Sequence, residues 1–209
     1  MIKKKFCLVG VDKDFEDFIL DNKKFYLGFF SNFHQKKYQI NKKLGKERIT
    51  DWVKVRKKFN PDVFILINDG KQREKLHEEI YKKNNKNLIL SKAVVAKSSM
   101  KNMSKQKGIV IQNFAIVSSE VQIDDGVKIH IGCQIHHEVK IGKYSTISPA
   151  SIILGKVKIG NYSFIGANST IKQNIKIGNN CIIGAGAVVV KDVKNGETVV
   201  GNPARKLSN

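Results

Sequence analysis

The sequence lacks a long apolar run and has few cysteines, and each shortage excludes a class of protein. No hydrophobic stretch approaches the roughly 20 residues that a membrane span needs. The basic start of the chain leads into an apolar stretch that is too short for a signal peptide. Three cysteines are too few for a disulfide framework, so we expect a cytoplasmic protein with reduced thiols.

Acidic residues are also scarce, with 18 aspartates and glutamates against 38 lysines and arginines and a net charge of +20. A concentrated basic patch would indicate nucleic-acid binding. Residues 1–90, however, hold 22 basic and 12 acidic residues, and residues 91–209 hold 16 and 6, so the excess is the same in both parts. We therefore expect a solvated, lysine-rich surface that can attract an anionic ligand, and no nucleic-acid partner.

A six-residue repeat dominates the second half of the chain. Fourteen consecutive positions, spaced by six from Ile111 to Val189, carry only isoleucine or valine. Four residues after each of them the side chain is small or β-branched, and a glycine directly follows several of them, as at Gly142 and Gly160. A period of six fits a short strand followed by a corner, and it predicts a parallel β-helix with an aliphatic interior over residues 109–209. We expect the glycines to permit tight turns.

Three such hexads close one triangular coil, so residues 18 apart are predicted to stack. Cys133 and Cys181 both occupy the small position, and we expect them to fill the core.

Residues 1–90 show a different pattern, in which short apolar runs alternate with amphipathic stretches. The pattern predicts a small parallel α/β domain, and residues 91–108 are expected to connect it to the β-helix. The predicted strands are Lys5–Gly10, Lys24–Phe30, Val63–Ile67 and Leu88–Leu90, and the predicted helices are Asp14–Leu20, Ile49–Lys58 and Lys71–Lys83. Ligands bind such sheets at the carboxyl ends of the strands. The candidate substrate-binding residues are therefore Gly10, Asp12, Ser31, Asn32, Asn68 and Asp69.

An α/β domain followed by an uninterrupted hexapeptide β-helix resembles the sugar O- and N-acyltransferases of the sialic-acid and bacillosamine type. The Gly184–Val193 run and the closing Val200–Arg205 stretch carry the most specific part of this resemblance. It implies a Rossmann-like N-terminal domain, a left-handed β-helix, acetyl-CoA as co-substrate, and a homotrimer with active sites between neighbouring β-helices.

The resemblance places the chemistry at His137 and Glu138, with His137 as general base and Glu138 orienting it. An imidazole suits this role because it titrates near neutral pH and can accept the proton of an attacking amine. Two residues beyond core Ile135, His137 is expected at a corner of the coil. Gly155 lies 18 residues further on and is predicted to stack beside it, where its N–H can stabilise an oxyanion.

Coenzyme contacts are also implied by the resemblance. Thr146 stands nine residues after His137, where the family often has a second histidine. Ala167 and Ala185 match family contact positions in a column of small residues. On charge alone, the coenzyme phosphates could be neutralised by Lys172, Lys176, Lys191 and Arg205.

The predicted function is acetyl transfer to the 4-amino group of a nucleotide-linked 4-amino-4,6-dideoxy sugar, for a bacterial surface glycan or glycoprotein. O-acetylation of a sialic-acid-like sugar is the close alternative, because both reactions need a base. A non-catalytic β-helix binding module is the alternative of another class. No metal is expected, because His130, His136 and His137 do not have the spacing of a three-histidine zinc site.

Overall fold

The computed structural model describes residues 6–9, 24, 26–30, 62–80, 88–90 and 93–207. Three parallel strands, β1 (Phe6–Val9), β2 (Tyr26–Phe30) and β3 (Asp62–Ile65), form a sheet in the order β2-β1-β3. Helix α3 (Gly70–Ile80) follows β3. These elements confirm three predicted strands and the third predicted helix, whereas the first two predicted helices lie outside the described residues.

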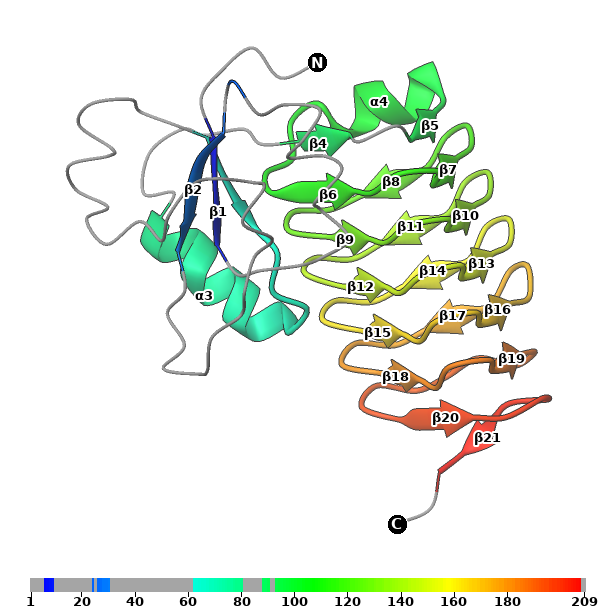
Figure 1. Cartoon of the computed structure of the whole chain (residues 1–209). Helices are drawn as coiled ribbons and strands as arrows, with labels where there is room; N and C mark the ends of the chain where they lie inside the picture. The colour runs from blue at the N-terminus through cyan, green and yellow to red at the C-terminus, as the bar shows by residue number, and fades with distance from the viewer. Residues whose placement is uncertain are drawn as a thin grey trace.

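The second half is a three-sided solenoid in which each side is a sheet of stacked two- or three-residue strands (Figure 1). The six-stranded sheet contains β5 (Val94–Val95), β7 (Ile116–Val117), β10 (Gln134–Ile135), β13 (Ile152–Ile153), β16 (Thr170–Ile171) and β19 (Val188–Val189). The four-stranded sheet contains β8 (Gln122–Ile123), β11 (Lys140–Ile141), β14 (Lys158–Ile159) and β17 (Lys176–Ile177).

The third side is an eight-stranded sheet, which also includes the two strands at the C-terminal end. It contains β4 (Leu88–Leu90), β6 (Ile109–Ile111), β9 (Lys128–Ile129), β12 (Thr146–Ile147), β15 (Phe164–Ile165), β18 (Ile182–Ile183), β20 (Thr198–Val200) and β21 (Arg205–Lys206). Its neighbouring strands are parallel except for β20 and β21, which are antiparallel.

The predicted aliphatic column is confirmed. Every repeat position from Ile111 to Val189 is buried, and Cys133 and Cys181 are buried in the same core as free thiols. Within the regular repeats, each strand pairs with the strand 18 residues away, as Ile135 does with Ile153. A period of six therefore produces stacked coils because three hexads bring the chain back to the same side.

Two expectations for this region need correction. Strand β4 was expected in the N-terminal domain, but it pairs with β6, and β5 pairs with β7, so the stacked sheets extend into the stretch expected to be a connector. Short apolar runs do not specify their partner, which explains the error.

The second correction concerns the glycines that directly follow repeat positions, which were expected to permit tight turns. The left-handed backbone of the corners falls instead on residues such as Glu138, at a φ of 58°. Gly142 is needed for space, because a Cβ there would lie 2.7 Å from the carbonyl carbon of Gly160 in the next coil.

Helix α4 (Lys97–Met103) covers the N-terminal end of the solenoid (Figure 1). Met103 is buried in the aliphatic core, and the Ser99 hydroxyl accepts a hydrogen bond from the Val121 N–H at 2.9 Å. The helix thereby covers core side chains and satisfies backbone groups that the first coil would otherwise expose. No described helix is long and apolar enough to cross a bilayer.

Candidate active site

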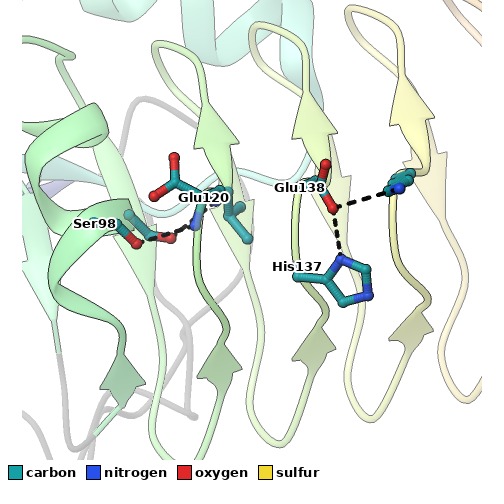
Figure 2. A network of polar contacts seen from close by, with 7 residues as sticks. Ser98, Glu120, His137 and Glu138 are labelled. Atoms are coloured by element: carbon teal, nitrogen blue, oxygen red, sulfur yellow. Dashed lines mark hydrogen bonds and ion pairs between the residues drawn. The ribbon is translucent and has the colours of Figure 1, made fainter.

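His137 and Glu138 lie at the corner where the chain turns from β10 on the six-stranded sheet to β11 on the four-stranded sheet. We call this edge, formed by residues 137–138 and 155–156, the His137 corner. Both side chains are about half exposed, at 55% and 50%. The left-handed backbone of Glu138 turns its carboxylate towards the preceding ring, and Oε2 lies 2.9 Å from Nδ1 of His137 (Figure 2).

This contact orients the imidazole for proton transfer. When Nδ1 donates its proton to the carboxylate, Nε2 carries the free lone pair and can accept a proton. Within the described part of the chain, no hydrogen bond to Nε2 of His137 is formed. This geometry meets the requirements for a general base.

Gly155 lies beside this ring, one coil further along the solenoid. A Cβ on Gly155 would stand 2.6 Å from both Cε1 and Nε2 of His137, so only a glycine leaves room for the ring in this position. The Gly155 carbonyl accepts a hydrogen bond from Asn174 at 3.0 Å, whereas its N–H has no hydrogen-bond partner among the described residues. A free backbone N–H thus lies next to the candidate base.

Lys156 also belongs to the His137 corner. Its Nζ lies 3.8 Å from Oε2 of Glu138, the same oxygen that contacts His137. Glu120 lies one coil before Glu138 on the same edge of the solenoid. Its N–H donates to Oγ of Ser98 at 3.1 Å, so α4 is hydrogen-bonded to the N-terminal end of this edge (Figure 2). The carboxylate of Glu138 is therefore shared between an imidazole and an ammonium group.

A groove of about 600 Å³ extends over the four-stranded sheet and passes this corner. Four lysines and two glutamates are among its lining residues, which are Glu120, Gln122, Glu138, Lys140, Lys156, Lys158, Asn174 and Lys176.

The predicted coenzyme residues are not gathered at the His137 corner of one chain. Ala167 and Ala185 follow β15 and β18, at the corner between the eight-stranded and six-stranded sheets. We call this edge the Phe114 corner, because Phe114 occupies it in the first coil. Lys191 is exposed in the turn after β19.

Thr146 has a different environment from the one expected. It is 2% exposed on β12, and its hydroxyl donates to the Asn68 carbonyl at 3.0 Å. Since this hydroxyl proton is engaged within the chain, the placement argues against the predicted contact between Thr146 and the coenzyme.

Asn68 and Asp69, predicted to bind substrate, lie where α3 meets the eight-stranded sheet. Asp69 caps the helix, accepting the Gln72 N–H on its carboxylate at 2.8 Å. The Asn68 side-chain oxygen accepts from Nζ of Lys128 at 2.8 Å. Both residues remain exposed on their outer side, so a ligand can reach them. Four further candidates, Gly10, Asp12, Ser31 and Asn32, lie outside the described residues.

A buried polar joint around these residues was not predicted from the sequence. Arg73 is 2% exposed, and its guanidinium donates to the carbonyls of Gly126 at 2.7 Å and Tyr144. Burial lowers the pKa of Arg73 to about 10, so it stays charged at neutral pH. Lys128, at 0% exposed, donates to the Leu66 carbonyl at 2.8 Å. We call Arg73, His77, Lys128 and Tyr144 the joint.

His77 and Tyr144 complete the joint. Nδ1 of His77 lies 2.9 Å from the Tyr144 hydroxyl, and Tyr144 stacks on Tyr162 with a ring-centre distance of 6.0 Å. Burial lowers the pKa of His77 and raises that of Tyr144. Among the described residues, no cluster of histidine, cysteine, aspartate and glutamate could hold a metal ion.

Comparison with known proteins agrees with this architecture. Residues 156–191 match the family model described as bacterial transferase hexapeptide (six repeats). The coils are hexapeptide repeats. No curated protein matches the chain. The hexapeptide β-helix is left-handed, as in that family.

Several solved structures share the fold over nearly their whole length. The acetyltransferase domain of PglB from Neisseria gonorrhoeae FA1090, in complex with acetyl coenzyme A, is 23% identical with a TM-score of 0.82, covering 98% of this chain and 99% of that one. A histidine-to-asparagine mutant of perosamine N-acetyltransferase from Caulobacter crescentus, with CoA and GDP-perosamine, is 20% identical with a TM-score of 0.82, covering 100% and 99%. WeeI from Acinetobacter baumannii AYE is 23% identical with a TM-score of 0.73, covering 98% and 100%.

Proposed function

We propose that this protein is a cytoplasmic acetyltransferase that moves the acetyl group of acetyl-CoA to the 4-amino group of a nucleotide-linked 4-amino-4,6-dideoxy sugar, for a bacterial surface glycan or glycoprotein. The observation that carries the proposal is the His137 ring, held by Glu138 at 2.9 Å and seated against Gly155. Support for the donor and acceptor comes from the similar structures, of which one binds acetyl coenzyme A and another binds CoA with GDP-perosamine.

The proposed mechanism is a direct transfer in a ternary complex. The sugar amine attacks the thioester carbonyl, and Nε2 of His137 accepts the proton that the nitrogen loses. The Gly155 N–H donates to the carbonyl oxygen as it becomes negatively charged. The tetrahedral intermediate then collapses, the C–S bond breaks, and the CoA thiolate leaves and takes up a proton. Glu138 keeps the imidazole in the tautomer that this step requires.

We assign the nucleotide part of the acceptor to a Rossmann-like domain that contains β1, β2, β3 and α3, followed by the catalytic β-helix, whose sheets begin with β4 and β5. The parallel order β2-β1-β3 supports a doubly wound sheet. Asn68 and Asp69 follow β3 at its carboxyl end, where such sheets bind ligands. We retain Gly10, Asp12, Ser31 and Asn32 as candidate contacts at the same edge.

We further propose a homotrimer with active sites between subunits. The outer face of the six-stranded sheet is apolar in its first coils, where Val94 and Ile116 are 66% and 46% exposed, and Phe114 and Ile131 extend it at the Phe114 corner. Exposed apolar patches of this kind mark interfaces. Packing these sheets around a three-fold axis would bring the His137 corner of one copy to the Phe114 corner of the next, together with the alanine column of Ala167 and Ala185.

The decisive experiment compares His137→Asn with His136→Asn. We expect the first change to lower kcat by about 10²–10⁴ with acetyl-CoA and a matching sugar nucleotide, since it removes a general base. The neighbouring His136 contacts neither Glu138 nor Gly155 in the described structure, so its variant should retain most activity. Near-normal turnover by His137→Asn would contradict the mechanism. Mass detection of products from amino and hydroxyl acceptors separates N-acetylation from O-acetylation.

A further inference from the structure

Three lysines form a column on the outer face of the four-stranded sheet. Lys140, Lys158 and Lys176 occupy the same position on β11, β14 and β17, and each is in register with the next. Neighbouring strands lie about 4.8 Å apart, so the three ammonium groups follow one another along the solenoid. Like charges directly opposite one another are destabilising. We call these three residues the lysine ladder.

Nothing in the described chain neutralises this ladder. Its three residues form no ion pair with a described carboxylate, and Glu138, one of the two glutamates lining the groove, already contacts His137 and Lys156. With Lys156 counted, the lining of the groove holds four lysines against two glutamates. Such a concave, positively charged surface attracts an anion with several negative charges.

The position of the ladder relates it to the proposed reaction. The groove extends from Glu120 and Gln122 past Glu138, the partner of the candidate base, to Lys176. The strands beneath it, β8, β11, β14 and β17, follow one another along the solenoid (Figure 1). Helix α3 contacts the corner between the four-stranded and eight-stranded sheets, and its furthest described hydrogen bond along the coils joins Glu74 to Tyr162. Lys176 thus lies one coil beyond the part of the solenoid that α3 contacts.

We propose that the lysine ladder binds the phosphate groups of the acyl donor, coenzyme A, while its thioester end lies at His137. This inference rests on the proposed function. Phosphate chemistry is shared by the coenzyme and the nucleotide sugar, but Lys176 lies beyond the coils that α3 contacts, and the coenzyme carries an additional 3′-phosphate. Lysine ammonium groups bind phosphate through charge-assisted hydrogen bonds.

The test compares the triple variant Lys140→Gln, Lys158→Gln and Lys176→Gln with a matched triple variant, Lys97→Gln, Lys101→Gln and Lys105→Gln. The control lysines are exposed on or next to α4, away from the groove. Calorimetry with CoA and with 3′-dephospho-CoA, and the KM values for acetyl-CoA and the sugar nucleotide, are measured for both variants and the wild type.

We expect the ladder variant to bind CoA about tenfold more weakly or worse, with a matching rise in the acetyl-CoA KM and little change in kcat or in the sugar-nucleotide KM. The wild type should bind 3′-dephospho-CoA more weakly than CoA, and the difference between the two ligands should be smaller for the ladder variant. The control triple should behave like the wild type. Because the three lysines repel one another, the melting temperature of the ladder variant should not fall below that of the wild type. If this triple variant nevertheless fails to fold, the single Lys158→Gln variant is measured instead.

Each opposing result is distinct. If the wild type binds CoA and the ladder variant binds it equally well, the inference is wrong and the proposed function stands. A rise confined to the sugar-nucleotide KM would assign the ladder to the acceptor and also overturn it. A wild type that binds no CoA at all would overturn the proposed function and this assignment together.

Discussion

The joint and the His137 corner each contain a histidine nitrogen 2.9 Å from an oxygen, but one pair is buried and the other is exposed to solvent. His77 is buried against the Tyr144 hydroxyl, and burial lowers its pKa. His137 is half exposed beside the Glu138 carboxylate. The buried pair is closed to ligands and holds α3 against the solenoid. The exposed pair leaves a ring nitrogen available to a ligand.

The contrast follows from how each region satisfies its polar groups. Inside the joint, Arg73 donates to several backbone carbonyls, so removing it leaves buried acceptors without their donor. At the His137 corner, solvent can replace any lost partner. We therefore expect changes in the joint to affect stability, and changes at the corner to affect activity.

Replacing Arg73 by methionine should cost about 3 kcal/mol or more of the free energy of unfolding, because a buried charged donor with several acceptors is lost. Urea denaturation followed by circular dichroism measures the change. Turnover per folded molecule should stay close to that of the wild type. Arg73→Lys, which keeps the charge, should recover part of the stability; equal losses in both variants would show that the guanidinium geometry is decisive.

Gly155→Ala should instead lower activity and leave stability nearly unchanged. The new Cβ would stand 2.6 Å from the His137 ring, which must move away from Gly155 and the bound thioester. A misplaced base can cost about 100-fold in kcat, whereas the melting temperature should hardly change. Gly196→Ala is the control for a glycine change that crowds no side chain. A Cβ there meets nothing within 4 Å but the φ is 73°, so the change should lower stability and leave kcat unchanged. Wild-type kcat in Gly155→Ala would remove the ring from the mechanism.

The same two regions show what a sequence can reveal. The period of six is local, so it predicted the coils, and His137 with Glu138 are neighbours in the chain, so their contact needed no knowledge of the fold. The joint depends on contacts such as that of Arg73 with Gly126, which are 53 residues apart. No spacing in the sequence marks such a pair. Lys128 occupies an outward repeat position that the sequence predicts to be solvated, but the segment from Leu66 to Asn68 covers it.

Thr146 illustrates the same limit for function. Its position relative to His137 suggested a coenzyme contact, but the covering segment takes its hydroxyl through the Asn68 carbonyl. Spacing along a solenoid specifies the coil and the side on which a residue lies. It does not specify which other part of the chain packs on that side.

Acidification should weaken the joint more than the corner. The pKa of His77 is lowered from 6.5 by burial, so the unfolded chain takes up a proton that the folded chain refuses as the pH falls. The contribution of neutral His77 to the free energy of unfolding is complete above about pH 6.5. It is lost as the pH drops towards the folded-state pKa, by at most about 1.4 kcal/mol per pH unit. Denaturation of wild type and His77→Gln at about pH 7.5 and about pH 5.5 measures this. An equal loss in both would assign the acid sensitivity to other groups.

Lys156→Gln should have the smallest effect. Its Nζ is 3.8 Å from Glu138, and the two side chains are 57% and 50% exposed, so solvent screens the pair. We expect less than about a threefold change in kcat, against about tenfold or more for Glu138→Gln, which removes the carboxylate charge that orients the base. The comparison is made at saturating acetyl-CoA, because Lys156 also lines the groove. If both variants lost activity equally, Glu138 would act as part of a tightly coupled network, and the contrast between an open corner and a closed joint would not hold.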